Sequence, residues 1–83
     1  MQFRYKTRGV CSSAINIDIE DDIIKSVEFV GGCPGNTRAV GILCKGRHID
    51  EIIDLLKGTP CRGKTSCPDQ LATALEYYKA ELR

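Results

Sequence analysis

Apolar and polar residues alternate along two early segments of the chain, residues 3–7 and 15–19. In each segment one set of alternate positions holds β-branched or aromatic residues, namely Phe3, Tyr5, Thr7, Ile15, Ile17 and Ile19. The positions between them are charged or polar. An alternation of period two is typical of a strand that buries one face, so both segments are predicted to be half-buried β-strands.

A third strand is predicted over residues 23–30, directly after a tight acidic turn at residues 21–22. Its inner residues are expected to be Ile23, Val27 and Phe29. Three short antiparallel strands form one sheet with one face to cover.

The rest of the chain has helical spacing. A glycine-rich break precedes a helix expected over about 36–45, with Val40, Leu43 and Cys44 on one face. Gly46 is a typical residue to end it. A second helix is expected over about 49–57, ending at Gly58. Its apolar stripe consists of Ile49, Ile52, Ile53 and Leu56.

The third helix is predicted to run from Cys67 to the C-terminus. Ser66 and Asp69, three residues apart, have the spacing of a capping box. The buried face is expected to contain Leu71, Leu75, Tyr78 and Leu82. The order of elements predicts one α+β domain over residues 1–83, with three helices packed on one face of a three-stranded antiparallel sheet.

The chain has 83 residues and a net charge of +1. This balance gives no reason to expect a nucleic-acid or membrane partner. No apolar run approaches the roughly 20 residues of a membrane span, and the N-terminal segment lacks a signal-peptide pattern. We therefore expect a cytoplasmic protein, in which cysteines are more often metal ligands or redox groups than structural disulfides.

Two of the five cysteines, Cys33 and Cys67, are each followed directly by proline. Proline is preorganised for the first turn of a helix, so each pair places a sulfur at a predicted helix start. Unpaired N–H groups and the helix dipole stabilise a thiolate there. Thiolates bind metals and attack disulfides.

Cys11 is expected in the turn between the first two strands, and Cys61 in the last loop. If the helices fold back over the sheet, this turn and two helix starts meet at one end of the molecule. Cys11, Cys33, Cys61 and Cys67 would then form a four-sulfur site, which suits zinc or an iron-sulfur cluster.

The spacing alone leaves alternatives open, because the chain contains no CxxC motif. Thiol-disulfide chemistry and inert buried cysteines are the other two interpretations. Cys44 follows the inner face of its helix and is expected in the core. His48 is a possible substitute ligand, but its position favours a solvated cap at the start of the second helix.

Residues 58–65 match the pattern of a phosphate-binding P-loop. The true motif follows a buried strand, whereas a helix is expected before Gly58, so we interpret the match as accidental. Lys64 is instead a candidate to stabilise nearby thiolates.

One histidine and scattered carboxylates do not form a credible triad, and we do not expect an autonomous hydrolase.

Residues 65–72 read TSCPDQLA, which resembles the signature of the TSCPD domain family. The resemblance extends to Cys11-Ser12, residues 29–33, Gly35-Asn36 and the Cys61 loop. It implies a four-cysteine set at Cys11, Cys33, Cys61 and Cys67, without Cys44. The same domain occurs at the C-terminal end of cobalamin-dependent ribonucleotide reductases, where its cysteines are suspected of binding metal or assisting thiol reduction. The resemblance thus implies a partner or accessory of a ribonucleoside-diphosphate reductase, because the chain is too short for a radical-generating barrel.

The chain is also similar, more distantly, to iron-sulfur scaffold proteins of the IscU/NifU type, which have three strands followed by helices. Cys11, Cys33 and Cys67 match their ligand positions. Ser13 and Ser66 stand where the scaffolds have Asp and His. The resemblance implies that Cys61 supplies the missing ligand, which favours storage of a metal over transfer of a cluster, and that an iron-sulfur assembly protein is a possible partner.

Overall fold

The computed structural model describes residues 1–10, 12–32, 34–58 and 66–83. The strands and helices follow one another in the order that the sequence predicts. They are β1 (Gln2–Lys6), β2 (Ser12–Glu20), β3 (Ile23–Gly31), α1 (Pro34–Cys44), α2 (Ile49–Leu56), α3 (Cys67–Tyr77) and the π-helical turn η1 (Tyr78–Leu82). The predicted α+β architecture is confirmed, with a three-stranded antiparallel sheet followed by three helices.

The sheet has the order β1-β2-β3, so that β2 is the central strand. The apolar residues of its inner face lie opposite one another, as in the pairs Tyr5 with Ile15 and Ile15 with Phe29. Asp21 and Asp22 join β2 to β3 with φ angles of 53° and 62°. Both angles lie in the left-handed region, which the short side chain of aspartate tolerates, and they produce the expected tight turn.

The prediction for the inner face of β3 is wrong at its first residue. Asp18 pairs with Ser26. The next residue of β2, Ile19, pairs with Ile24, so β3 contributes one extra residue to the ladder at this point. Such a bulge reverses the alternation, because successive side chains of a strand point to opposite faces. As a result Ile24 is fully buried and Ile23 is not.

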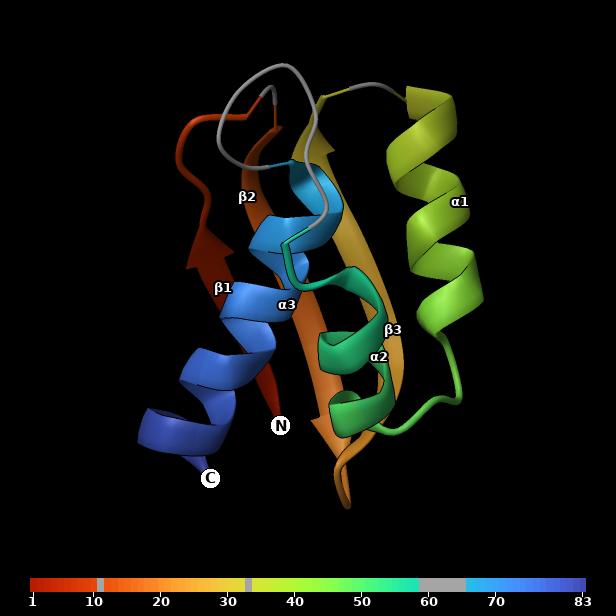
Figure 1. Cartoon of the computed structure of the whole chain (residues 1–83). Coiled ribbons are helices and arrows are strands. Elements are labelled where there is room, and N and C mark those ends of the chain that lie inside the picture. The colour runs from red at the N-terminus through yellow and green to blue at the C-terminus, as the bar shows by residue number, and fades with distance from the viewer. Residues whose placement is uncertain (11, 33, 59–65) are drawn as a thin grey trace.

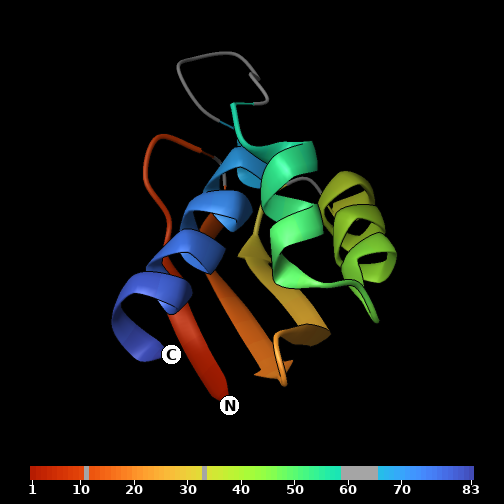
Figure 2. The ribbon, with the colours of Figure 1, turned by 60° about the horizontal axis from the view of Figure 1, so that its bottom comes forward.

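All three helices lie on one side of the sheet (Figures 1 and 2). Helices α2 and α3 cover its inner face, and α1 is the outermost helix, beside β3. The core between the layers is built from apolar side chains of β2, β3 and the helices. Its most buried members are Ile15, Ile17, Ile19, Ile24, Cys44, Ile49, Leu71 and Leu75.

The predicted inner face of α1 is correct at Cys44 and wrong at Leu43. Cys44 is buried in the core, whereas Leu43 is 66% exposed. Helix α1 packs mainly against β3, so only the strip of its surface that faces this strand is buried, and Leu43 lies outside that strip.

Helix α1 approaches β3 closely at Gly41. A Cβ atom at this position would lie 2.6 Å from the backbone oxygen of Val27 in β3. This separation is too short for any side chain, so only glycine permits the helix to pack so closely along the edge of β3. Gly35, in the first turn of the same helix, has no atom within 4 Å of its virtual Cβ.

The helix ends follow the residues that the sequence singles out. His48 is the N-cap of α2, and its Nδ1 atom accepts a hydrogen bond of 3.1 Å from the backbone N–H of Asp50. Gly46 and Gly58 adopt φ angles of 85° and 83°, which suit the chain after a helix end. The expectation of a cap at His48 is confirmed.

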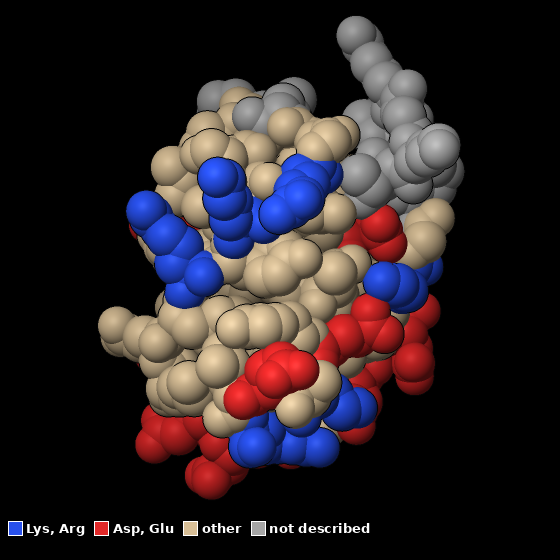
Figure 3. Space-filling model, turned by 90° about the vertical axis from the view of Figure 1, so that its left-hand side faces the viewer, with Lys and Arg blue, Asp and Glu red and all other residues tan. Residues whose placement is uncertain are grey.

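The surface carries charged side chains of both signs. On the side where β1 lies outermost, basic side chains group in the upper half of the view and acidic ones lie mainly in the lower half (Figure 3). Within the described ranges, no helix combines the length and the apolar character that crossing a bilayer requires.

The approach at Gly41 generates a prediction about stability. We expect Gly41→Ala to lower the free energy of unfolding by about 1–3 kcal/mol, because the added methyl group forces α1 away from β3. Gly35→Ala is the matched control in the same helix. It should be neutral or stabilising by up to about 1 kcal/mol, because alanine is the better helix former and meets open space. Chemical denaturation measures both, and equal stability of the two variants would contradict the packing argument.

Candidate functional site

Cys67 is the one predicted metal ligand that falls within the described ranges, and it is the first residue of α3. Cys11, Cys33 and Cys61 lie outside the described residues. Ser66 is the N-cap, and its hydroxyl accepts a hydrogen bond of 3.1 Å from the backbone N–H of Asp69. Pro68 follows in the first turn. The sequence prediction of a helix start at this Cys-Pro pair is confirmed.

The thiol of Cys67 lies against the beginning of β2. Its Sγ atom is 3.3 Å from the hydroxyl oxygen of Ser12, and both side chains are buried. The backbone oxygen of Ser12 in turn accepts a hydrogen bond of 2.5 Å from the buried hydroxyl of Thr7. This arrangement fixes the residue that follows Cys11 in the sequence directly beside Cys67.

The end of β3 reaches the same place. Ser12 pairs with Gly31 across the sheet, and α1 begins three residues later, at Pro34. Gly31 and Gly32 have φ angles of 78° and 86°, a conformation that favours glycine and turns the chain away from the sheet. The start of β2, the end of β3 and the first turns of α1 and α3 therefore lie at one end of the molecule (Figure 1).

Asp69 holds both ends of the segment formed by residues 59–65. Its Oδ1 atom accepts a hydrogen bond of 2.6 Å from the backbone N–H of Gly58, and its own N–H donates to Ser66. Nearby, the Lys57 ammonium group donates to the Thr73 hydroxyl at 3.0 Å and forms an ion pair with Glu76 at 2.8 Å. The hydrogen bond to Glu76 is the main cause that raises the pKa of Lys57. These contacts tie the end of α2 to the first three turns of α3.

Gln70 provides a comparable link to the segment between β1 and β2. Its side-chain oxygen accepts a hydrogen bond of 3.0 Å from the backbone N–H of Arg8, which lies 62 residues away in sequence. The roles of Asp69 and Gln70 were missed by sequence reasoning, which considered Asp69 only as part of a capping box. The available signal was the run of polar side chains directly after the Cys-Pro pair.

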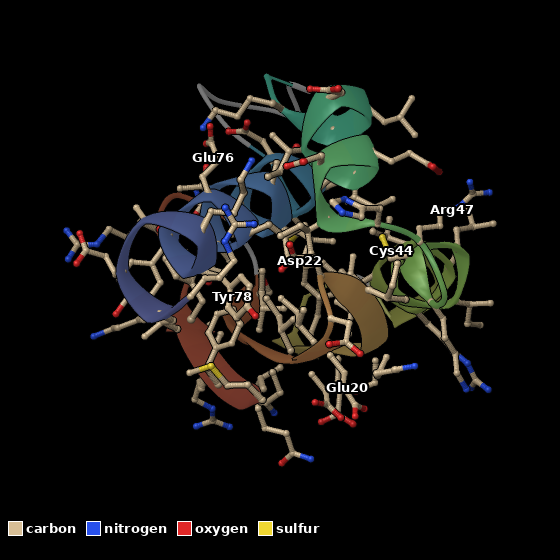
Figure 4. All side chains as sticks on the ribbon, turned by 90° about the horizontal axis from the view of Figure 1, so that it is seen from below. Glu20, Asp22, Cys44, Arg47, Glu76 and Tyr78 are labelled. Carbon is tan, nitrogen blue, oxygen red and sulfur yellow. The ribbon has the colours of Figure 1, made fainter. Side chains whose placement is uncertain are left out.

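Cys44 lies at the opposite end of the molecule, where α1 ends (Figure 4). It is a free thiol that is 2% exposed. Burial raises its pKa from 9.0 to about 11, against a smaller opposing effect of the Arg47 charge. The prediction that Cys44 is a core residue and not a ligand of the four-sulfur site agrees with this location. The ring of His48 also lies away from Cys67, because the caps of α2 and α3 are at opposite ends of the fold.

The chemistry of the described donors fits a metal-bound thiolate at Cys67. A helix N-terminus favours negative charge, and a hydroxyl beside the sulfur can donate a hydrogen bond to a thiolate ligand. Within residues 1–10, 12–32, 34–58 and 66–83, no group of three or more His, Cys, Asp or Glu residues is arranged to hold a metal ion. Three of the four predicted ligands lie outside these ranges, so the four-cysteine set stays a prediction.

Comparison with models of protein families shows to which family the chain is related. The model of the TSCPD domain family matches residues 2–79. The chain belongs to the TSCPD domain family. This membership agrees with the resemblance seen at residues 65–72, the stretch in which Ser66, Asp69 and Gln70 form the hydrogen bonds described above. No match is found among curated proteins or among solved structures.

The P-loop-like match covers residues 58–65, of which only Gly58 is described. The element before it is the helix α2, as the sequence predicts, and not the strand that a P-loop requires. The role suggested for Lys64 falls outside the described residues.

The buried thiol of Cys44 predicts a pH dependence of stability. The unfolded thiol ionises near pH 9 and the folded one near pH 11. The contribution of the neutral, buried thiol to the free energy of unfolding is therefore fully present below pH 9. As the pH rises towards 11, the free energy of unfolding falls by about 2–3 kcal/mol, because the unfolded thiol ionises first. Urea unfolding between pH 8 and pH 11 should show a steeper loss for the natural chain than for Cys44→Ala. Parallel curves for the two proteins would contradict the assignment.

The link between Asp69 and Gly58 predicts a second effect on stability. We expect Asp69→Ala to lower the free energy of unfolding by about 1–2 kcal/mol, because the N–H of Gly58 loses its acceptor. Asp69→Asn retains an oxygen acceptor and should recover more than half of this loss. Asp54→Ala, an exposed change on α2, serves as the control and should have an effect below about 0.5 kcal/mol. An Asn variant as unstable as the Ala variant would show that the hydrogen bond is not responsible.

Proposed function

We propose that this protein binds a zinc ion or an iron-sulfur cluster through Cys11, Cys33, Cys61 and Cys67, as an accessory module and not as an autonomous enzyme. Membership of the TSCPD domain family supports a module related to ribonucleotide reductase. The four-cysteine donor set supports the class of ligand, because four thiolates suit zinc and iron-sulfur clusters.

The contact between Ser12 and Cys67 carries the proposal. Zinc–sulfur bonds are about 2.3 Å long, so four ligands of one metal must come from backbone positions that lie close together. Cys67 touches Ser12, which is joined by one peptide bond to Cys11. Ser12 also pairs with Gly31, two residues before Cys33. Consecutive Cα atoms are 3.8 Å apart. The described neighbours of three predicted ligands therefore support a common site.

The anchoring of the segment 59–65 supports the fourth ligand. Cys61 lies three residues after Gly58 and five before Ser66 in sequence. Gly58 and Ser66 are both hydrogen-bonded to Asp69, two residues after Cys67. Both described neighbours of the segment that contains Cys61 are therefore hydrogen-bonded close to Cys67. This proximity favours participation of Cys61 in the site of Cys67.

A bound metal would cross-link segments that the 83-residue chain otherwise joins through a small core. The residues of the chain have two tasks at this site. The first turn of α3 presents the sulfur of Cys67 at a helix end that favours negative charge. The hydroxyl of Ser12 orients towards that sulfur and can tune it as a ligand.

The burial of Cys67 favours metal binding over the alternative, a thiol-disulfide shuttle that re-reduces a partner enzyme. The side chain is 7% exposed. Thiol exchange requires that an external disulfide reaches the sulfur, and reactive redox cysteines are accordingly partly exposed. A ligand of a closed structural site has no such requirement.

We expect the anaerobically purified protein to contain metal at a fixed ratio per chain, measured by elemental analysis. Visible absorption with equal amounts of iron and sulfide would indicate a cluster, and a colourless zinc protein would indicate the single ion. Serine at any one of Cys11, Cys33, Cys61 or Cys67 should lower the bound metal at least about tenfold, because each change removes one of four ligands.

Cys44→Ser is the matched control and should retain the metal, because Cys44 lies at the other end of the fold. A metal-free protein in which Cys67 forms a reducible disulfide would refute metal binding and favour the shuttle. A metal-free protein with five unmodified thiols would refute both.

A further inference from the structure

The two edges of the sheet have different surroundings. Helix α1 lies along the edge of β3, where Gly41 permits contact with the backbone oxygen of Val27. Strand β1 forms the opposite edge, and among the described residues it is hydrogen-bonded in the sheet to β2 alone. Helix α3 lies over the inner face, and the turn η1 reaches past the lower part of β1 near the C-terminus (Figures 1 and 2).

The hydrogen-bond pattern shows which backbone groups β1 leaves open. Met1 and Ile19 exchange two hydrogen bonds, of 2.6 and 2.9 Å, and the N–H of Thr7 donates to Ser13 at 3.2 Å. In an antiparallel pair, residues that are hydrogen-bonded to the neighbouring strand alternate with residues whose N–H and C=O groups point away from it. In β1 the backbone groups of Gln2, Arg4 and Lys6 therefore point away from β2.

The edge of β1 is protected against pairing by charge, through the exposed side chains of Arg4 and Lys6. Other proteins blunt an open edge with proline, a bulge or a covering element. The β1 sequence QFRYK has no proline, and its register with β2 has no shift. The guanidinium of Arg4 is held by Asn16 in the central strand, at 2.9 Å from Nε to Oδ1, and so lies over the outer face of the sheet. The backbone edge is therefore regular over five residues, and Gln2, Arg4 and Lys6 are exposed.

The charges near this edge restrict what can pair with it. Arg4, Lys6 and Arg8 are all exposed and follow at intervals of two residues. On this side of the molecule several basic side chains gather in the upper part of the face, and others lie among acidic side chains in the lower part (Figure 3). Antiparallel pairing of two β1 edges would set Arg4 and Lys6 of one copy against the same basic residues of the other. Like charges that face each other across strands are destabilising, so a second copy is a poor occupant.

We propose that the open edge of β1 binds an extended acidic segment of a partner protein, which adds to the sheet as a fourth strand. The backbone groups of Gln2, Arg4 and Lys6 supply the hydrogen bonds. Acidic side chains at alternate positions of the partner lie beside Arg4 and Lys6 on the outer face. This mode gives affinity through the main chain and selectivity through the charged side chains. The surface is separate from the cysteine site and does not depend on the metal.

The test uses a seven-residue peptide of alternating glutamate and valine with blocked ends, added to the isotope-labelled natural chain. Strand addition has a characteristic signature in amide hydrogen exchange. The amides of Arg4 and Lys6 should exchange at least about tenfold more slowly with peptide, because they acquire acceptors. The amides of Phe3 and Tyr5 already face β2 and should change little. A peptide with lysine in place of glutamate should give no protection.

Charge variants test the selectivity of the edge. Lys6→Glu should weaken binding of the acidic peptide about tenfold, and Lys25→Glu, an exposed lysine on β3, should leave it within about twofold. Arg4→Glu combined with Lys6→Glu should reverse the preference in favour of the lysine peptide, which a general loss of folding cannot do.

Three outcomes would overturn the proposal. The first is no binding of the acidic peptide up to about 1 mM. The second is binding without protection of the Arg4 and Lys6 amides, which would indicate charge attraction alone. The third is equal or tighter binding of a single-stranded oligonucleotide at the same salt concentration, which would indicate a phosphate-binding surface.

Discussion

The first turn of α3 holds three separate segments of the chain in place by hydrogen bonds. Ser66 caps the helix, Asp69 accepts from Gly58 at the end of α2, and Gln70 accepts from Arg8 after β1. The thiol of Cys67 contacts Ser12 at the start of β2. Each contact uses a side chain from one short stretch of sequence. Loss of this turn would therefore release the chain on both sides of the predicted cysteine cluster.

This turn can serve as a fixed point because the rest of α3 is anchored in the core. Leu71 and Leu75 are fully buried, and Phe3 stacks on Tyr78 with ring centroids 5.7 Å apart. Complete burial of a leucine side chain contributes about 1.5–3 kcal/mol. The apolar face of the helix thus stabilises the fold, and the polar residues of its first turn hold the neighbouring segments in place by hydrogen bonds.

The sequence predicts the features that depend on local chemistry. The strand alternation, the cap at Ser66, the glycines after α1 and α2 and the burial of Cys44 are all confirmed. The errors arise where pairing with another segment of the chain decides the outcome. The bulge opposite Ile19 depends on how two strands pair, and it exchanges Ile23 for Ile24 in the core. The bond from Arg8 to Gln70 joins residues 62 positions apart, and no local pattern indicates it. For the candidate site, the structure describes only the surroundings of Cys67. The complete set of four cysteine ligands is predicted from the sequence alone.

The two described thiols, Cys44 and Cys67, lie in different environments, and this difference agrees with the prediction that Cys44 is set apart from the other cysteines. At Cys44 the surroundings are apolar, and burial raises the pKa to about 11. Metal ligation requires the thiolate, so a metal at Cys44 would have to overcome that desolvation without other ligands nearby. At Cys67 the sulfur lies at a helix N-terminus and beside a hydroxyl, two surroundings that accommodate negative charge. The two thiols are both buried, and what distinguishes them is the polarity of the groups that cover each sulfur.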